Sequence, residues 1–384
     1  MPKSECPDVL DGRRGFRIEA PWGRVSMLAQ GGHISEITSQ QHGGLSPLWR
    51  PPWKTIDPGD YQPGRHGRRY GPPPDGRLLS GLVGHNLSFD HFGPPSPNET
   101  RAGLSTHGEA PVTEWTLKNS DSTTIECSAT LAEARIRLSR NLSVDTKYPT
   151  IYCEETAENQ TPFDRPISWT QHVTMGPPFL EAGVTRVDMP GTHSRTCTAS
   201  YSDRTPIRPD SDFEWPFAPA KSGRKIDLRI MPQARYGHYT AQLLDTELKH
   251  GWVAASNPRL GLLIVYVFDR AMYPWVGNWE ERLARDPAPW NGRTFCRGME
   301  FSTTPFAIPR RQTIEQNRMF DTPTYTWLPA QSQVCIRYVT ALFAIESDFS
   351  GIGSVTLDRG RLKVAEQKRG GATLQRTIRR WLHN

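Results

Sequence analysis

Two side chains of the kinds that exchange protons stand far apart in the chain. His172 lies within SWTQHVTMGPPF (168–179), and Glu300 lies within FCRGMEFSTTPFAIP (295–309). Imidazole and carboxyl groups are common general acids and bases, and one of each can take a proton from a substrate and return one. Each residue also has a plainer interpretation, as a strand residue whose side chain faces water. The secondary-structure elements that carry His172 and Glu300 decide between the catalytic and the solvent-facing interpretation.

The residues around His172 predict a strand with two different faces. Side chains at positions i and i+2 share a face, so Trp169 and Gln171 lie on the side opposite His172. The face of His172 is otherwise small and polar, formed by Ser168, Thr170 and Thr174. Such a face predicts either the floor of a sugar-binding cleft or a surface exposed to solvent.

Glu300 also occupies an extended run. Its chain neighbours Met299 and Phe301 are large and apolar, whereas Gly298 and Ser302 share its face. A carboxyl group beside an apolar wall resists ionisation, which raises its pKa toward that of an effective general base. The alternative is a strand glutamate that faces water.

Three further side chains suit sugar binding. His107, in AGLSTHGEAP, precedes Gly108, where a ligand or a backbone segment can approach closely. Trp275 and Trp279 share a face in AMYPWVGNWEERL, and large aromatic rings suit the C–H faces of a sugar. The alternatives are a loop histidine and two tryptophans of the core.

Motifs for metal or cofactor chemistry are not found. His85 and His91, in GLVGHNLSFDHFG, stand six residues apart, which is not a usual helical spacing of metal ligands. The chain also lacks an HExxH pattern, paired cysteines, a GxSxG elbow and a phosphate-binding glycine loop. We therefore expect neither a metal site nor a cofactor.

The candidate residues need a scaffold of many short strands. Turn-bounded, strand-like stretches predict strands at 16–40, 112–156, 167–175, 226–231, 239–246, 251–256, 261–269 and 335–345. Their spacing predicts an all-β, antiparallel fold and argues against alternating strands and helices. Residues 354–366 add a predicted hairpin.

Two segments depart from the strand pattern. Residues 44–77 are rich in proline and predict a long irregular loop, either a surface strap anchored by its aromatic residues or a wall of a ligand site. The tail has apolar residues at helical spacing and predicts a short C-terminal helix over 374–382. No shift in composition marks a boundary, so we expect one β domain over 1–384, with its core at about 16–345.

Composition narrows the partners and the compartment. A net charge of +6 is modest for 384 residues, and the basic clusters at 65–70 and 376–384 do not make the continuous stripe of a nucleic-acid-binding protein. The longest apolar run, GLLIVYVF (261–268), is too short to cross a membrane and predicts a buried strand. Scattered cysteines and an N-terminus without an apolar core predict a cytoplasmic protein. We expect no nucleic-acid or membrane partner.

Five motifs carry a resemblance through their order: QGGHISEI, LSTHGEAP, SWTQHVTMGPPF, YPWVGNWEE and CRGMEFSTTPF. Together they resemble the aldose 1-epimerase (galactose mutarotase-like) superfamily over about residues 16–345, as a divergent member. The resemblance implies a β-supersandwich, which is a large twisted antiparallel sandwich with its site on a concave sheet. It also implies that Glu300 and His172 are catalytic and that His107 binds substrate.

One segment departs from the superfamily pattern. Members often have an arginine before the first site histidine, where this chain reads HNLSFDHFG. We therefore expect His85 or Asn86 to contact the sugar there. Trp275 or Trp279 would stack on the sugar ring.

The implied reaction interconverts the α and β anomers of an aldose. Glu300 removes the proton of the anomeric hydroxyl, and His172, held protonated by a nearby carboxylate, gives a proton to the ring oxygen. The expected partner is a small sugar, without a cofactor. Two alternatives fit the same fold. One is a carbohydrate-binding protein without catalysis, and the other is a glycoside hydrolase or lyase, with Glu181, Glu280 or Glu281 as a second carboxylate.

Overall fold

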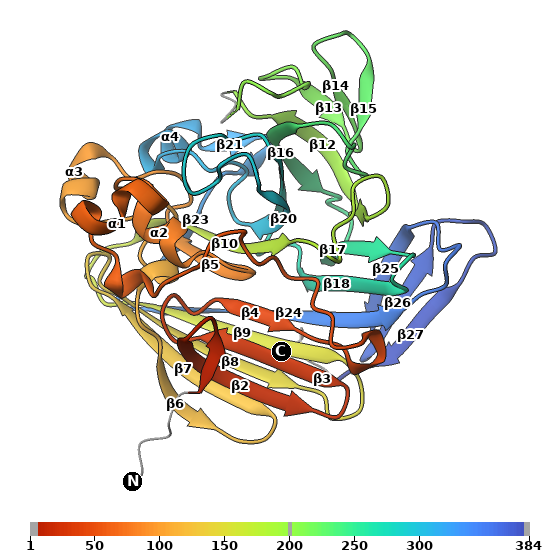
Figure 1. Cartoon of the computed structure of the whole chain (residues 1–384), viewed down its shortest axis with the longest axis horizontal. Coiled ribbons are helices and arrows are strands. Elements are labelled where there is room, and N and C mark those ends of the chain that lie inside the picture. Colours follow the sequence, from red (N-terminus) through yellow and green to blue (C-terminus); the bar gives the residue numbers. More distant parts are fainter. Residues whose placement is uncertain (1–6, 199–201, 380–384) are drawn as a thin grey trace.

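In the part of the chain that the structure describes, two large antiparallel β-sheets pack face to face, and four short α-helices lie at one end (Figure 1). The computed structural model describes residues 7–198 and 202–379. The first sheet runs in the order β1 (Asp8–Leu10), β2 (Arg13–Ala20), β3 (Gly23–Leu28), β4 (Ile34–Ile37), β5 (His85–Asp90), β10 (Arg165–Met175), β20 (Phe295–Ser302), β19 (Trp275–Arg282), β16 (Tyr236–Leu244), β12 (Gly191–Thr196) and β13 (Asp212–Glu214), and β23 (Thr326–Leu328) pairs with the start of β10. The all-β antiparallel prediction is confirmed.

The second sheet covers the first along much of its length. Its order is β11 (Arg186–Asp188), β17 (His250–Asn257), β18 (Leu262–Asp269), β24 (Gln333–Ala344), β9 (Thr150–Asn159), β8 (Ile136–Val144), β7 (Thr124–Leu131) and β6 (Thr116–Ser120). Strand β18 is the apolar run expected to be buried, and all its residues but the last are buried. Two small two-stranded hairpins are formed by β14 (Phe217–Pro219) with β15 (Lys225–Asp227) and by β21 (Arg318–Met319) with β22 (Thr322–Pro323).

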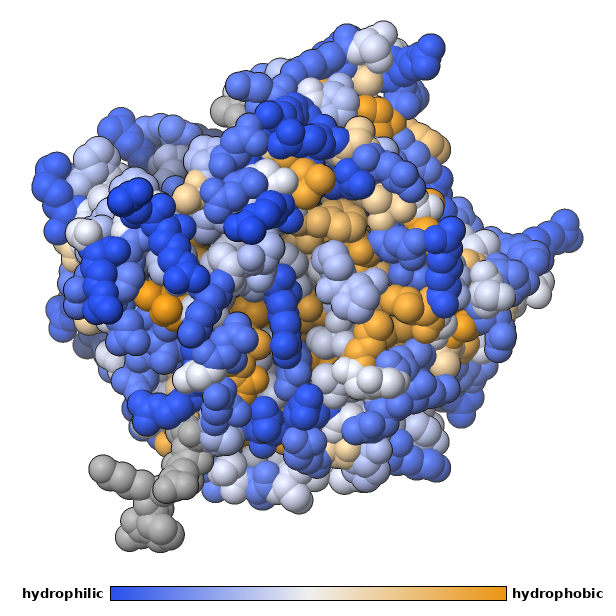
Figure 2. Space-filling view, viewed as in Figure 1, coloured by the Kyte–Doolittle hydropathy of each residue, from blue (hydrophilic) through white to orange (hydrophobic). Residues whose placement is uncertain are grey.

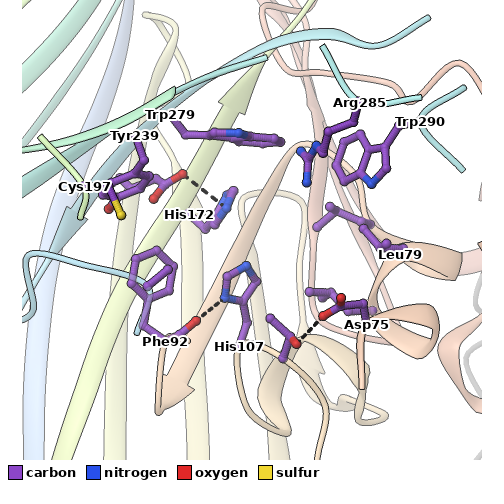
Figure 3. A pocket seen from close by; sticks show the side chains of 15 residues that line it. Asp75, Leu79, Phe92, His107, His172, Cys197, Tyr239, Trp279, Arg285 and Trp290 are labelled. Carbon is purple, nitrogen blue, oxygen red and sulfur yellow. Dashed lines mark hydrogen bonds and ion pairs between the residues drawn. The ribbon is translucent and has the colours of Figure 1, made fainter. Parts of the chain in front are cut away.

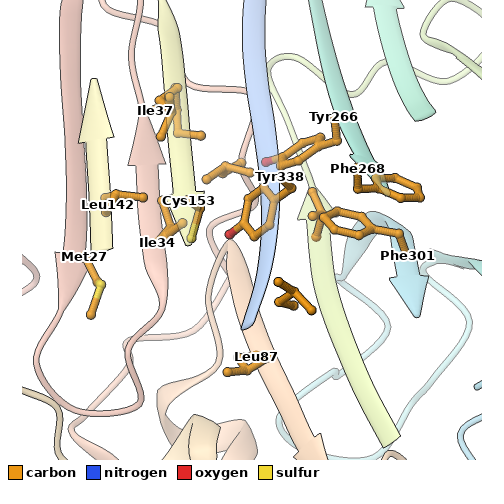
Figure 4. Close-up of a cluster of buried hydrophobic side chains, with 14 of the residues drawn as sticks. Met27, Ile34, Ile37, Leu87, Leu142, Cys153, Tyr266, Phe268, Phe301 and Tyr338 are labelled. Carbon is orange, nitrogen blue, oxygen red and sulfur yellow. The ribbon is translucent and has the colours of Figure 1, made fainter. Parts of the chain in front are cut away.

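The main core lies between the two sheets. Figure 4 shows part of it, where Phe301 of the first sheet meets Tyr266 and Tyr338 of the second, with ring centroids 5.7 and 5.4 Å apart. Each large side chain buried in this way contributes about 1.5–3 kcal/mol to folding. In Figure 2 the surface on this side is mainly hydrophilic, with apolar groups confined to patches.

Strand β10 has the two faces expected from its sequence. Trp169 and Gln171 point between the sheets, where both donate to the Glu155 carboxylate of β9 at 3.0 and 2.5 Å. Arg140 of β8 balances that carboxylate at 2.7 Å. His172 therefore lies on the other face of the first sheet, away from the core.

The proline-rich segment 44–77 is more regular than predicted. It contains the short 3-10 helix η2 (Pro58–Asp60), helix α1 (Pro63–Tyr70) and the start of α2 (Asp75–Gly81). Proline is compatible with the first turn of a helix, where its missing N–H has no partner to lose, and Pro63 occupies that position in α1. The other helical pieces are η1 (Gln40–His42), α3 (Pro97–Arg101), η3 (Ala110–Val112) and α4 (Arg310–Gln316).

The predicted C-terminal helix is wrong where the structure describes it. Residues Thr373–Thr377 form β27, which pairs with β26 (Arg361–Glu366), and β26 pairs with β25 (Ile352–Asp358) as the predicted hairpin. Pairing satisfies the open backbone edge of β26, and this outweighs the helical spacing of a few apolar residues. The last part of the expected helix, 380–382, lies outside the described residues. The three strands pack on the outer face of the second sheet, with Leu362 and Val364 in the shared cluster.

No helix in the described part of the chain is long and apolar enough to cross a membrane.

Candidate active site

A cavity of about 300 Å³ opens on the outer face of the first sheet (Figure 3). Strands β10, β16, β19 and β20 form its floor, while α2 and the loops after β5, β12, β19 and β20 form its walls. The lining residues are Asp75, Leu78, Leu79, Leu82, Phe92, Thr106, His107, Cys197, His172, Tyr239, Trp279, Arg285, Trp290, Glu300 and Ala307. The floor is thus built from the strands that carry the acid–base candidates.

His172 and Glu300 meet on the floor of this cavity. They lie directly opposite each other on the paired strands β10 and β20, and His172 Nε2 is 3.2 Å from Glu300 Oε1. Both are buried, with 4% and 1% of their surfaces exposed. Residues 128 positions apart in the chain thereby come together as a histidine and a carboxyl group in a site shielded from bulk water.

Two glycines make room for the Glu300 carboxylate. Gly298 is on the same strand face, and a Cβ there would collide with Glu300 Oε1. Gly277 is the partner of Glu300 on β19, and a Cβ there would collide with the hydroxyl of Tyr239 and lie 3.1 Å from Glu300 Oε2. The small face predicted around Glu300 therefore accommodates the carboxylate itself.

Burial sets the protonation of the pair. It raises the pKa of Glu300 to about 8, against a smaller opposing effect of the Tyr239 hydroxyl. Burial, reinforced by nearby His107, lowers the pKa of His172 well below its usual value. The expectation that the carboxylate keeps His172 protonated is wrong, because desolvation and the neighbouring histidines disfavour the protonated ring. These two shifts favour the neutral form of both side chains, with the proton on Glu300.

His107 enters the cavity from the loop after β5. Its ring stacks on Phe92 with centroids 5.0 Å apart, and its Nδ1 donates to the Phe92 carbonyl, as Figure 3 shows. Since a carbonyl can only accept, Nε2 is left as an acceptor for a ligand hydroxyl. Burial lowers the pKa of His107 to about 4, which keeps the ring neutral. The following Gly108 is needed because a Cβ there would collide with the Phe89 carbonyl.

Tryptophans form the opposite wall. Trp279 lies beside His172, with ring centroids 5.7 Å apart, and meets Trp290 edge to face at 6.0 Å. Trp290 in turn contacts Trp53, which contacts Trp49. The last two belong to segment 44–77, so this segment both anchors itself through buried aromatics and, through α2, supplies a wall. Both predictions for segment 44–77, an anchored strap and a wall of a ligand site, therefore describe part of its structure.

Three of the expected substrate-binding residues do not line the cavity. His85 points between the sheets, where its Nε2 lies 2.9 Å from Gln171 Oε1 and its ring packs on Tyr266 and Tyr338. Asn86 is on the face of His172 and pairs with it across the sheet, but it is fully buried and does not line the cavity.

Trp275 shares the face of Trp279, as the alternation predicts, but is covered. It donates to the Pro323 carbonyl at 2.9 Å and packs in a separate cluster with Phe306 and Met319. The hairpin of β21 and β22 thus seals it from the cavity.

Several lining residues carried no signal in the sequence. Tyr239 sits on β16 beside Glu300, and burial together with the Glu300 charge raises its pKa well above the usual value. Arg285 lies with its guanidinium 3.3 Å from the centroid of the Trp290 ring and forms an ion pair with Glu281 at 2.9 Å. The β19–β20 loop thus brings the guanidinium group of Arg285 to the cavity wall. Only the alternation along β16 could have pointed to Tyr239.

No protein-family model and no curated protein matches the sequence. Solved structures do match. A proposed aldose 1-epimerase from Klebsiella pneumoniae aligns with a TM-score of 0.60 at 14% identity, over 84% of this chain and 77% of that one. A galactose mutarotase-like protein from Clostridium acetobutylicum aligns with a TM-score of 0.56 at 12% identity, over 89% and 100%.

A galactose 1-epimerase from Lactobacillus acidophilus aligns with a TM-score of 0.53 at 10% identity, over 88% of this chain and 98% of that one. Identities this low relate the folds and leave the activity open. The sequence motifs and the structural matches agree: the protein has the galactose mutarotase-like fold, in a sequence that has diverged far from its structural neighbours.

Proposed function

We propose that the protein is an aldose 1-epimerase-like isomerase, which interconverts the α and β anomers of an aldose by acid–base ring opening. The observation that carries the proposal is the buried pair of Glu300 and His172, 3.2 Å apart, on the floor of a cavity with an aromatic wall. The structural neighbours named as aldose 1-epimerases or mutarotases support the same reading.

Opening a pyranose ring needs one proton removed from the anomeric hydroxyl and one delivered to the ring oxygen. In the proposal Glu300 is the base and His172 the acid. The two states of the pair, neutral and ionic, hold the same single proton and differ only in its position. Hydroxyl groups of a bound sugar donate to the carboxylate, which lowers the pKa of Glu300 and moves the proton to His172.

The cavity walls suit a sugar bound above this pair. Trp279 offers an apolar ring face for the C–H groups of the sugar, and the Nε2 atom of His107 accepts from a hydroxyl. The substrate in the proposal is therefore a small sugar, and the reaction uses no cofactor. We also keep a cytoplasmic location as a prediction from the sequence.

The test is NMR of anomer exchange for a panel of aldoses. The wild type should accelerate exchange for at least one sugar, and Glu300→Gln should lose about 10²–10⁴-fold of the enzymatic rate. Glu181→Gln is the matched control, because Glu181 is partly exposed and pairs with Arg259. Sugar binding without exchange in the wild type would identify a carbohydrate-binding protein instead.

A glycoside hydrolase has less support. The reaction needs two carboxyl groups about 5–10 Å apart across the bond. None of the three carboxylates considered from the sequence lines the cavity: Glu280 is beside Arg297, Glu281 is paired with Arg285, and Glu181 lies elsewhere. Asp75 is the other carboxyl group that lines the cavity beside Glu300. A glycoside hydrolase would be supported if the wild type released reducing sugar from glycosides and Asp75→Asn did not.

A further inference from the structure

A second cavity adjoins the proposed active site. It measures about 610 Å³, twice the volume of the first, and the two share Asp75, Leu79, Arg285 and Trp290 in their linings. The shared residues place the two cavities side by side, and we call them together the cleft, with an inner and an outer part. A sugar bound over Glu300 would occupy only its inner part.

The two cavities differ in depth. Glu300 and Trp290 are buried, with 1% and 6% of their surfaces exposed, whereas Pro72 and Asp286 of the outer cavity are exposed. The outer cavity lies between the α1–α2 loop and the β19–β20 loop. With a volume of about 610 Å³, the outer cavity has room for a second sugar ring.

The charges along this cleft are balanced within the protein. Arg204 and Arg235 both pair with Asp286, at 2.7 and 3.0 Å, and Arg285 pairs with Glu281 at 2.9 Å. Each cation therefore already has a carboxylate partner, and an anionic ligand would have to displace one. The other walls are apolar, from residues such as Leu79 and Ala288. Apolar faces beside paired polar groups suit an uncharged, hydroxyl-rich ring.

We propose that the outer cavity binds the second sugar residue of an uncharged oligosaccharide whose reducing-end residue occupies the inner cavity. This inference rests on the proposed function, and it names the substrate class of the same site. The anomeric carbon must face Glu300 and His172 on the floor. The rest of the chain then leaves past Arg285 and Trp290, through the outer cavity. The preferred substrate is a reducing disaccharide or a longer oligosaccharide.

Anomer exchange of glucose and galactose is compared with that of uncharged reducing disaccharides with 1→3, 1→4 and 1→6 linkages. We expect kcat/KM for the best disaccharide to exceed that of its reducing-end monosaccharide by about tenfold or more. Ala288→Trp, which fills the outer cavity, should remove this gain and leave monosaccharide exchange within about twofold. Ala372→Trp, in the exposed turn between β26 and β27, is the matched control and should change neither.

The outcomes separate this inference from the proposed function. If monosaccharides are turned over and no disaccharide is preferred, the outer site is refuted while the isomerase stands. If no sugar is turned over, the isomerase function is refuted and sugar binding is measured by calorimetry. Tighter binding of disaccharides than of monosaccharides, lost in Ala288→Trp, would then still support the outer site. Equal binding or no binding would refute the outer site as well. A preference for disaccharides ending in a uronic acid would overturn the assignment of an uncharged ligand.

Discussion

Replacing Glu300 with glutamine should stabilise the protein, and the gain should grow with pH. The folded state holds the proton of Glu300 up to a pKa of about 8 because the carboxyl group is buried, whereas an unfolded chain releases it near pH 4.5. Between these two values the folded state binds more protons than the unfolded state. The free energy of unfolding of the wild type therefore falls as the pH rises across this window.

The size of the effect follows from the two pKa values. Each pKa unit corresponds to about 1.4 kcal/mol, so the penalty is on the order of 3 kcal/mol at pH 7 and below about 1 kcal/mol at pH 5. Glutamine mimics the neutral carboxyl group and avoids this penalty. Urea unfolding of wild type and Glu300→Gln at both pH values, followed by tryptophan fluorescence and circular dichroism together, measures the difference.

Glu280→Gln is the control of opposite sign. Glu280 is also buried, and burial alone would raise its pKa, but Arg297, 3.2 Å away, and His238 lower it overall. Its ionised form stabilises the fold above pH 4.5, so this substitution should destabilise the protein at pH 7, and less so at pH 4. The reasoning is refuted if Glu300→Gln is less stable than the wild type at pH 7. That result would mean that an ion pair with protonated His172 already holds the carboxylate.

Three further predictions concern activity. The kcat/KM for anomer exchange, corrected for the uncatalysed rate, should stay constant from about pH 6 to 7 and fall about tenfold per pH unit above pH 8. The fall is expected because Glu300 and His172 together then lose their only proton. Activity should persist at pH 6 because the lowered pKa of His172 prevents the pair from binding a second proton there. Gly298→Ala should lower kcat by about 10²-fold with little change in KM, because its methyl group displaces Glu300; steady-state kinetics and a retained fold by circular dichroism check this. Trp279→Leu should raise KM by about tenfold, whereas Trp275→Phe, sealed from the cavity, should lower Tm and leave KM within about twofold.

Side-chain direction was predictable where the strand sequence alternates. On β10 the large and the small residues separate cleanly, so His172 could be assigned to the face opposite Trp169. On β5 the sequence also alternates, because Leu87 and Phe89 share the face of His85, whereas Ser88 and Asp90 share the face of Asn86. The position of His85 in the core therefore follows from the same alternation, whereas the burial of Asn86 on the opposite face depends on segments that the strand sequence does not reveal.

Contacts between segments far apart in the chain could not be predicted from local sequence patterns. The register that brings Glu300 opposite His172 depends on how β20 pairs with β10, and no feature of either segment specifies it. The covering of Trp275 depends on the β21–β22 hairpin, which follows it by more than forty residues. The helical spacing of the tail does not reveal the open edge of β26, with which residues Thr373–Thr377 pair as β27. In each case a tertiary partner decided the outcome.

The walls of the cavity explain why the floor can work at neutral pH. An exposed carboxyl group has a pKa near 4.5 and is a weak base, whereas the burial of Glu300 raises its pKa to about 8, close to the pH at which it must exchange a proton. Part of that burial comes from α2 and the β19–β20 loop, which stand outside the strands of the sandwich. The protein thus holds a destabilising carboxyl group where the proposed reaction needs one. In Glu300→Gln, the predicted gain in the free energy of unfolding and the predicted loss of the rate of anomer exchange would together measure this trade-off between stability and activity.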